Sequence, residues 1–541
     1  MSSSSAVVCR ELSFNWPDGT AVFTDFHCMF GTGRSALIGR NGTGKSTLLR
    51  LIAGEARPAS GQVTVNGSLA YLPQDVQLQV GRTVAEVLGI AEIRAAIDRI
   101  ERGDGDQRWF EVVGEDWDVD ERAGQVLADI GLAGTELDRP VGQLSGGQSV
   151  LLALAALLLR RPEVLLLDEP TNNLDRHARQ RLHEVVRGWR GSLIVVSHDR
   201  ELLELVDQIG ELREGSLRWY GGNFSDYQGL VEAEQEAAAR QVRAAEQQLR
   251  RQQSELVEAR TALNRRLRYG RKMREQKREP KIIMNARRSA AQVSAGKYRN
   301  LHLDRVEEAR RELAAAEAQV HDDRSIRIGL PATGVPAGRQ VLSLDELVTR
   351  AGGPWQLRLY GAERIALTGP NGAGKTTLLD TIAGRLAPIA GSVDVAVPMR
   401  YLPQRLDILD PNRTVLANVA TFAPGVSENR LRAGLARLLF RGRRADQLVA
   451  TLSGGERFRA TLAALLLAEP APQLLLLDEP TNNLDLASVA ELIDGLSAFQ
   501  GALIVASHDL PFLQELEPTS WLDVQPGAPG AGGSQAGGPM P

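Results

Sequence analysis

The chain repeats part of its own sequence, and this repeat constrains the fold more than any other feature. The stretch Gly39–Ser46 (GRNGTGKS) returns as Gly369–Thr376 (GPNGAGKT), 330 positions later. The stretch Leu165–Asp175 (LLLDEPTNNLD) returns letter for letter as Leu475–Asp485, 310 positions later. A 541-residue chain with repeats at this spacing is predicted to contain two copies of one domain.

Shorter segments repeat in the same order in both copies. They are Tyr71–Gln74 with Tyr401–Gln404, Leu144–Gln148 with Leu452–Glu456, and Ser197–Asp199 with Ser507–Asp509.

The two copies differ in the length of one segment. Gln74 and Ser145 are 71 positions apart, whereas Gln404 and Ser453 are 49 apart, so the first copy has 22 more residues here. The surplus includes Arg102–Glu121, which is polar and acidic. This stretch is either a contact surface or a longer helical subdomain, and we favour the second interpretation.

Short apolar runs come directly before the repeated glycine-rich and acidic motifs. They are Ala36–Gly39, Val164–Leu167 and Leu193–Val196 in the first copy, and Ile365–Gly369, Leu474–Leu477 and Leu503–Val505 in the second. Continuous apolar runs of this length are typical of parallel strands that are covered on both faces. Each copy is therefore predicted to be an α/β domain.

Between the two copies, Ser225–Ser325 is polar and has an apolar residue at every seventh position. These heptad residues are Val242, Leu249, Leu256 and Leu263, and on the return arm Val306, Leu313 and Val320. The pattern predicts an α-helical antiparallel coiled-coil hairpin that turns near Gly270 and Pro280.

The middle of this linker, Arg265–Arg299, carries a concentrated positive charge. It has 13 Lys and Arg against 2 Asp and Glu, a local net charge of +11 in a chain whose net charge is −4. Ordinary solvated helices mix both signs, so charge this segregated indicates a polyanionic partner. The alternative is a solvated linker whose charges only keep it soluble.

These patterns divide the chain into four parts. They are a first α/β domain (1–224), the basic linker (225–325), a second α/β domain (326–524) and a tail (525–541). The tail holds six Gly and four Pro, a composition typical of disorder.

Composition narrows the class of protein further. The longest apolar run, Val150–Leu159, has about half of the ~20 residues that a membrane span needs, and the N-terminus lacks a signal-peptide pattern. Cys9 and Cys28 are the only cysteines, and their spacing fits no metal motif. We expect a cytoplasmic protein without a thiolate metal site.

A strand followed by G-x-x-x-x-G-K-S/T and a helix binds nucleotide phosphates, because glycines let backbone amides surround the phosphate oxygens. Lys45 and Lys375 are predicted to reach the β- and γ-phosphates of ATP. The phosphate-binding residues are Gly39, Asn41, Gly42, Gly44, Lys45, Ser46 and Thr47, and Gly369, Asn371, Gly372, Gly374, Lys375, Thr376 and Thr377.

The acidic motifs supply the remaining chemistry of ATP hydrolysis. Predicted Mg²⁺ ligands are Ser46, Gln74 and Asp168 in the first copy, and Thr376, Gln404 and Asp478 in the second. Glu169 and Glu479 are placed to orient or deprotonate the attacking water. His198 and His508 are expected to contact the γ-phosphate, and Gln74 and Gln404 to sense the metal and the water.

This set of motifs resembles the ATP-binding cassette family, over about residues 7–524 apart from the linker. The resemblance implies two cassettes that meet head to tail around two ATPs. Ser145, Gly146, Gly147 and Gln148 would then complete the site of Lys375, and Ser453, Gly454, Gly455 and Glu456 the site of Lys45. Trp16 is placed like the aromatic residue that stacks on adenine, with no clear equivalent near Leu344–Thr349.

Two fused cassettes joined by a charged helical linker resemble the ABC-F subfamily. The resemblance implies a monomeric ATPase that acts on the ribosome, in antibiotic protection or in translation control. Ribosomal RNA and tRNA are rich in phosphate, so Arg265–Arg299 is the predicted contact. Two alternatives stay open: the ATP-binding subunit of a macrolide-type exporter, and a DNA-repair or chromosome ATPase.

Overall fold

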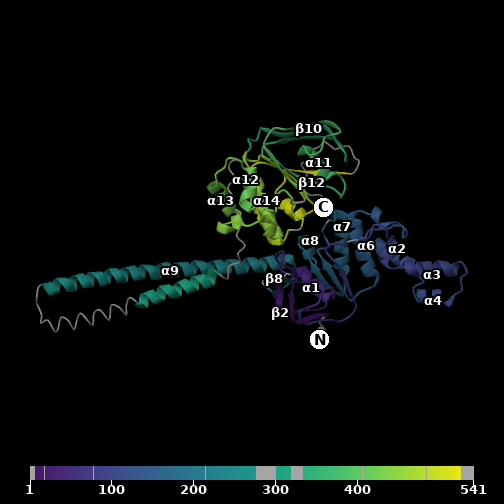
Figure 1. Cartoon of the computed structure of the whole chain (residues 1–541), viewed down its shortest axis with the longest axis horizontal. Coiled ribbons are helices and arrows are strands. Elements are labelled where there is room, and N and C mark those ends of the chain that lie inside the picture. The colour runs from purple at the N-terminus through teal and green to yellow at the C-terminus, as the bar shows by residue number, and fades with distance from the viewer. Residues whose placement is uncertain are drawn as a thin grey trace. The chain divides into compact units, whose positions relative to one another are not determined.

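The computed structural model describes residues 6–17, 19–76, 78–172, 174–213, 215–275, 300–317, 333–404, 407–482 and 484–525. It separates into two compact units (Figure 1). One unit contains both predicted cassettes (Met1–Phe224 and Arg324–Pro541), and the other is the linker (Ser225–Asp323). None of the helices in the described ranges is long and apolar enough to cross a membrane.

The first cassette is built on a six-stranded sheet in the order β5-β6-β7-β3-β8-β9, parallel except for the last pair. The strands are β3 (Gly33–Ile38), β5 (Leu69–Leu72), β6 (Val164–Asp168), β7 (Ser192–Val196), β8 (Gln208–Arg213) and β9 (Ser216–Gly221). Every residue of β6 and β7 is buried, as the apolar runs predict. The two strands end side by side, so their carboxyl ends place Asp168 and Ser197 at one edge of the sheet.

A second, antiparallel sheet in the order β2-β1-β4 covers helix α1 (Lys45–Ile52). Its strands are β1 (Val7–Asn15), β2 (Ala21–Phe30) and β4 (Ser60–Val65). Apolar side chains of both sheets and of α1 form one core, with Phe30, Leu48 and Leu166 fully buried. The glycine-rich loop before α1 is therefore held between two sheets.

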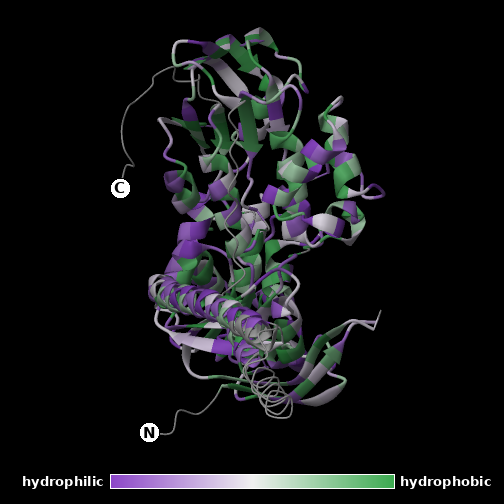
Figure 2. Cartoon of the chain, turned by 90° about the vertical axis from the view of Figure 1, so that its left-hand side faces the viewer, coloured by the Kyte–Doolittle hydropathy of each residue, from purple (hydrophilic) through white to green (hydrophobic). Residues whose placement is uncertain are grey.

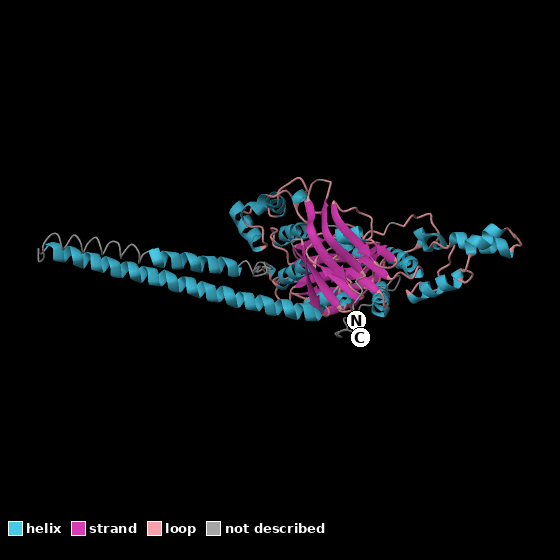
Figure 3. Ribbon diagram, turned by 90° about the horizontal axis from the view of Figure 1, so that it is seen from below, coloured by secondary structure: helices cyan, strands magenta, loops and turns pink. Residues whose placement is uncertain are grey.

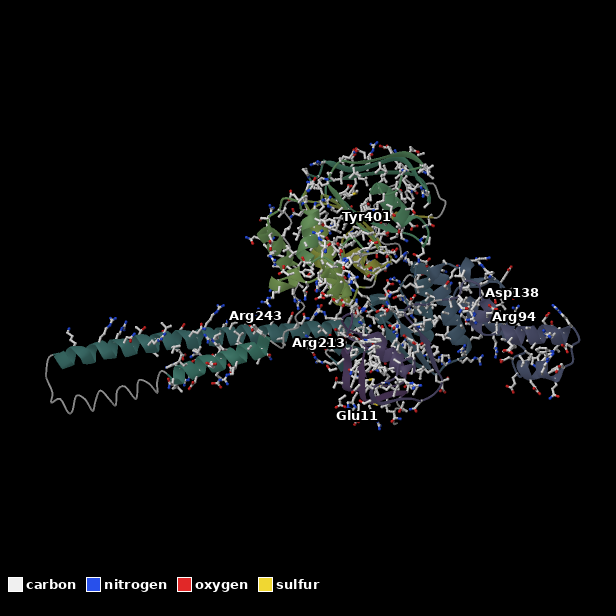
Figure 4. All side chains as sticks on the ribbon, viewed as in Figure 1. Glu11, Arg94, Asp138, Arg213, Arg243 and Tyr401 are labelled. Atoms are coloured by element: carbon white, nitrogen blue, oxygen red, sulfur yellow. The ribbon has the colours of Figure 1, made fainter. Side chains whose placement is uncertain are left out.

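The remaining helices of the first cassette are α2 (Val84–Leu88), α3 (Ala91–Glu101), α4 (Gln107–Val113), α5 (Val119–Asp129), α6 (Gly146–Leu159), α7 (Arg176–Gly188) and α8 (Arg200–Leu203), with a 3-10 turn η1 (Val141–Gln143). The surplus residues of this cassette form α4 and the start of α5. In Figure 4, Arg94 of α3 points toward Asp138, and its guanidinium bonds Asp138 at 2.7 Å and Asp120 at 2.9 Å. These ion pairs tie the surplus helices to the cassette.

The second cassette repeats this plan with a five-stranded sheet, β14-β15-β16-β12-β17, and a three-stranded sheet, β11-β10-β13. The strands are β10 (Gln340–Thr349), β11 (Gly352–Tyr360), β12 (Arg364–Thr368), β13 (Ala390–Val395), β14 (Met399–Leu402), β15 (Leu474–Asp478), β16 (Ala502–Ala506) and β17 (Ser520–Asp523). The helices are α11 (Lys375–Ile382), α12 (Val415–Phe422), α13 (Glu428–Arg437), α14 (Gly454–Leu466), α15 (Leu486–Ser497) and α16 (Leu510–Glu515), with 3-10 turns η3 (Gly442–Asp446) and η4 (Val449–Thr451).

The linker unit contains the long helix α9 (Phe224–Glu275) and a second helical stretch, residues 300–317, which run side by side in Figures 1 and 3. Figure 2 shows mainly hydrophilic residues along α9 and hydrophobic ones in the strands of the cassettes. On the return stretch the heptad residue Val306 is buried. The predicted fold class is confirmed for two tandem α/β cassettes with a helical region between them in the sequence.

The predicted turn near Gly270 is wrong, because α9 continues through this residue to Glu275. A glycine inside a helix costs only about 1 kcal/mol relative to alanine, which a helix of 52 residues tolerates. Pro280, Val320 and the basic residues from 276 to 299 lie outside the described ranges, as does the tail from 526 onward.

Candidate active site: two ATP sites

The glycine-rich loops adopt backbone geometry that only glycine accepts easily. Gly39 and Gly44 have φ angles of 147° and 101°, and Gly369 and Gly374 repeat them at 137° and 103°. A Cβ at Gly44 would lie 2.5 Å from Cγ1 of Val22, so β2 packs directly against the loop. We call the site around the first loop the first ATP site and the site around the second loop the second ATP site.

Each loop encloses its own lysine. Nζ of Lys45 donates to the carbonyl oxygens of Gly39 (2.6 Å) and Arg40 (3.1 Å), and Nζ of Lys375 donates to Gly369 (2.7 Å) and Pro370 (3.2 Å). Burial lowers the pKa of both lysines, and nearby acidic residues oppose this shift. A buried ammonium group held by neutral carbonyls is placed to bind an anionic phosphate.

Oxygen donors converge beside each lysine. In the first site Oγ of Ser46, from α1, donates to Oδ1 of Asp168 at 3.0 Å, and the Tyr71 hydroxyl donates to Oδ2 at 3.3 Å. In the second site Tyr401 lies 3.5 Å from Oδ2 of Asp478. Burial raises the pKa of both aspartates.

Carboxylate and hydroxyl oxygens are the ligands that Mg²⁺ prefers, so Ser46 with Asp168 and Thr376 with Asp478 fit this ion. Gln74 and Gln404 are exposed and follow β5 and β14, which lie next to the strands that end in Asp168 and Asp478. Their contribution to metal binding stays a prediction.

Glu169 and Glu479, directly after β6 and β15, have φ angles of 47° and 46°. A non-glycine residue in this left-handed region carries backbone strain, which concentrates at functional sites. Oε1 of Glu169 lies 3.3 Å from Nε2 of His198, and Oε1 of Glu479 lies 3.5 Å from Nε2 of His508. The structure thus brings each predicted base next to the predicted histidine of its own cassette.

Burial dominates the protonation of these four groups. It raises the pKa of Glu169 to about 8 and that of Glu479 to about 7, while the neighbouring lysines oppose the rise. It lowers the pKa of His198 and His508 to about 3. The imidazoles are therefore neutral at physiological pH. The Glu479 carboxyl group, with a pKa of about 7, is well matched to act as a general base there, whereas the higher pKa of Glu169 favours its protonated form.

The two cassettes each contribute an aspartate to the other's glycine-rich loop. Oδ2 of Asp485 accepts a hydrogen bond from the backbone N–H of Asn41 at 2.7 Å, and Oδ2 of Asp175 accepts one from Asn371 at 3.5 Å. The other carboxylate oxygen of each aspartate caps its own helix, α15 or α7.

Asp175 and Asp485 are not among the site residues predicted from the sequence. The signal was available, because each ends the repeated stretch LLLDEPTNNLD at the same offset from the catalytic glutamate. A helix-capping role explains such an aspartate without any function, so the contact across the cassettes was visible only in the fold.

The serine-glycine-glycine segments begin α6 and α14. Ser145 and Ser453 form capping boxes with Gln148 and Glu456, so these side chains satisfy the first turns of their helices. A Cβ at Gly454 would lie 4.0 Å from Nδ2 of Asn41, which places this segment of the second cassette beside the first ATP site. That Ser145, Gly146 and Gly147 complete the second site stays a prediction.

Trp16 follows β1, is 39% exposed and packs edge-to-face on Phe14 with ring centroids 5.2 Å apart. Strand pairing aligns Ser13 with Ser60 in the first cassette and Val348 with Ala390 in the second. Beyond these pairs the two hairpins differ, because β1 and β2 are separated by five residues and β10 and β11 by only two, Arg350 and Ala351. Ala351 packs against Gly374 as Val22 packs against Gly44, so the turn of the second hairpin has no aromatic residue like Trp16. That Trp16 stacks on adenine stays a prediction.

Two phosphate-binding loops, each with a buried lysine, a hydroxyl–carboxylate pair and a glutamate–histidine pair, define a tandem P-loop nucleotide-binding protein. The family model described as ABC transporter matches residues 29–172 and 354–482. The chain is 35% identical over 506 residues to the tylosin resistance ATP-binding protein TlrC of Streptomyces fradiae, covering 88% of this chain and 89% of that protein.

The chain is also 32% identical over 510 residues to the probable ATP-binding protein YheS of Escherichia coli K12, covering 90% of this chain and 74% of that protein. Among solved structures, the fold is similar to that of an RNase-L inhibitor, with a TM-score of 0.56, 19% identity, and coverage of 96% of this chain and 88% of that one. The chain belongs to the ABC-F family of ATP-binding cassette ATPases. It is an enzyme that hydrolyses ATP to ADP and phosphate.

Proposed function

We propose that this ATPase acts on the ribosome, in the cytoplasm, as an antibiotic-protection factor. Two ATPs bound between the cassettes hold them together, the basic linker contacts ribosomal RNA and tRNA, and hydrolysis releases the protein. The observation that carries this proposal is the pair of cross-cassette contacts, Asp485 to Asn41 and Asp175 to Asn371. They make the two phosphate-binding loops part of the surface between the cassettes.

In each site the residues have separate tasks. Lys45 and Lys375 bind the phosphates, and Glu169 and Glu479 accept a proton from the attacking water. Ser46 and Asp168 in the first site, and Thr376 and Asp478 in the second, would hold Mg²⁺, which would supply positive charge to the phosphate oxygens. The neutral imidazoles of His198 and His508 lie beside the glutamates and orient the γ-phosphate and the water.

The linker supplies the contact with RNA. Arg265, Arg268 and Lys272 are exposed on α9 at the start of the segment with a net charge of +11. Lys and Arg side chains bind phosphate by charge and release counterions, so this binding weakens with salt. The similarity to a tylosin resistance protein supports protection against a ribosome-targeting drug.

The first test is co-sedimentation with ribosomes of the protein carrying both Glu169→Gln and Glu479→Gln, with and without ATP. These changes block proton transfer while leaving the phosphate-binding loops intact, so the proposal expects pelleting that depends on ATP. Pelleting that is absent in both conditions contradicts it and favours the exporter subunit or a DNA-directed ATPase.

A second test uses the linker in the same Glu→Gln background. Replacing Arg265, Arg268 and Lys272 by alanine is expected to weaken ribosome binding at 150 mM salt by roughly tenfold or more, because about three phosphate contacts are lost. The matched control replaces the exposed Arg240, Arg243 and Arg250 of the same helix. Equal losses in both triple variants would contradict a specific role for the basic segment.

A further inference from the structure

An arginine of the first cassette contacts the catalytic histidine segment of the second. Nη1 of Arg179, on α7, donates to the backbone carbonyl of His508 at 3.4 Å. Its Nε lies 3.4 Å from Oδ2 of Asp199 in its own cassette. The Arg179 side chain is only 15% exposed, so a largely buried charged group lies between the two histidine segments.

Asp199 anchors this guanidinium. Oδ1 of Asp199 caps α8 by accepting the N–H of Leu202 at 3.2 Å, which leaves Oδ2 to face α7. There it meets Arg179 and also Nε2 of His183, at 3.6 Å. The ion pair with Asp199 keeps the guanidinium in a defined position. Separating the two groups would leave two largely buried charges without a partner, which is unfavourable.

Within the described ranges the second cassette makes no reciprocal contact with His198, because its equivalent positions are apolar. At the repeat offset of 310, Arg179 corresponds to Val489 and His183 to Ile493. Val489 is 4% exposed and belongs to the core, so α15 has no cation at this position to offer His198.

A second polar contact shows the same inequality. Arg200 of α8 pairs with Glu515 of α16 in the other cassette. The corresponding positions are Leu510 and Leu205, which carry no charge. Polar contacts from the first cassette thus hold the segment His508–Glu515, whereas their equivalents toward His198 are absent from the described residues.

His508 contacts three other residues of the second ATP site, so its position affects all of them. Its Nε2 lies 3.0 Å from Nζ of Lys375 and 3.0 Å from Oδ1 of Asn371, and its backbone N–H donates to Oε2 of Glu479 at 3.3 Å. A shift of the His508 backbone would therefore move the imidazole relative to the lysine, the phosphate-binding loop and the catalytic glutamate together.

We propose that Arg179 is a positioning residue that acts from the first cassette on His508 and makes hydrolysis at the second ATP site depend on closure of the two cassettes. At the equivalent position of the second cassette, the residue is Val489 and not an arginine. This inference rests on the ATPase activity of the two sites and is independent of the ribosome as partner, so failure of ribosome binding leaves it intact.

The experiment isolates each site with one Glu→Gln change. In Glu169→Gln protein only the second site hydrolyses, and in Glu479→Gln protein only the first site does. Arg179→Val, which installs the residue of the opposite cassette, is added to both, and kcat and KM for ATP are measured without ribosomes. Single-turnover measurements with enzyme in excess replace steady-state rates where turnover is slow.

Arg179→Val is expected to lower kcat at the second site by about tenfold or more, since small misplacement of a catalytic group has effects of this size. We expect KM to change by less than about threefold, because the phosphate-binding loop itself is untouched. At the first site the same change should alter kcat by less than about twofold. Arg179→Lys is expected to restore most of the second-site rate, because it keeps the charge.

Arg181→Ala is the matched control on the same helix, since the Arg181 side chain is 37% exposed and its ion pair is with Glu184 of its own helix. Equal loss at both sites overturns the proposal and shows a general structural role, and no loss at the second site overturns it as well. Should Arg179→Val fail to fold, Arg179→Gln and Arg179→Lys provide the same comparison, with the thermal midpoint recorded for each.

Discussion

The two ATP sites have equivalent lysines, aspartates, glutamates and histidines, but the contacts that each site receives from the opposite cassette differ. At the first site the contact from Asp485 to the N–H of Asn41 is short, 2.7 Å, while its counterpart from Asp175 at the second site is 3.5 Å. The second site instead receives Arg179 at His508. Two closely similar sets of motifs therefore lie in two sites with different contacts from the opposite cassette.

The difference arises in residues that follow the repeated motifs. Asp199 and Asp509 occupy the same motif position, and burial favours the protonated form of both. Nevertheless the pKa of Asp199 is lowered, because His183 and Arg179 face it from α7, whereas the pKa of Asp509 is raised by its burial. Catalytic motifs can thus stay constant while the helix packed against them sets their electrostatics.

The largest effect should come from the catalytic glutamates. The double change Glu169→Gln and Glu479→Gln is expected to lower kcat by about 100-fold or more, because both general bases are lost. Each single variant should keep measurable turnover from the remaining site, and phosphate-release assays will show which site contributes more. A single variant as slow as the double one would mean that the sites hydrolyse only together, which would break the comparison.

Trp16 should distinguish the sites by their affinity for the base. Trp16→Ala is expected to weaken ATP binding at the first site by roughly tenfold, since stacking of a base on an aromatic ring contributes about 1–3 kcal/mol. The measurement is a titration with a fluorescent ATP analogue in Lys375→Ala protein, which leaves the first site to bind.

Trp16→Phe is the control for this prediction, because it keeps an aromatic face. Unchanged affinity in Trp16→Ala would show that the exposed ring does not contact the nucleotide. In Lys45→Ala protein, where the second site binds, Trp16→Ala should have no effect.

Replacing the aspartates that contact the opposite cassette should have a smaller effect, and the effect should differ between Asp485 and Asp175. Serine retains the helix cap but is too short to reach the other cassette, so Asp485→Ser and Asp175→Ser test the contact alone. Asp485→Ser is expected to weaken ATP-driven closure by about 3- to 10-fold, the effect of one hydrogen bond, and Asp175→Ser by less. Crosslinking across the cassettes at increasing ATP concentrations measures both, and a larger effect of Asp175→Ser would reverse the inequality.

The smallest effect concerns stability at acidic pH. Arg34 forms an ion pair with Asp207 at 2.7 Å, while its counterpart Arg364 donates to backbone carbonyls such as that of Leu516. The hydrogen bonds from Arg34 lower the pKa of Asp207 in the folded protein. The pair therefore stabilises the fold fully at a pH above the pKa that Asp207 has in the unfolded chain. This stabilisation is lost as the pH falls through the lower pKa of the folded state.

Both partners are partly exposed, and the contribution should stay below about 1 kcal/mol. Thermal midpoints measured from pH 6 down to pH 3 should fall more steeply in the wild type than in Asp207→Asn. Parallel curves would show that this pair does not stabilise the first cassette differently from the second.

Much of the fold and of the chemistry was predictable because it depends on short segments. The apolar runs before Asp168 and Asp478 had to be buried strands, and the glycine-rich loops need positive φ angles whatever surrounds them. Gly270 was predicted wrongly as a turn residue, because one glycine costs a helix only about 1 kcal/mol and α9 continues to Glu275.

The sequence by itself determined two ATPase cassettes and predicted their phosphate-binding lysines, metal ligands and bases, since these are local patterns repeated at matching offsets. Only the tertiary structure decided that Asp485 reaches Asn41 and that Arg179 reaches His508. The physical reason is that each of these contacts joins residues more than 300 positions apart. A local pattern of charge or hydrophobicity cannot predict such a contact.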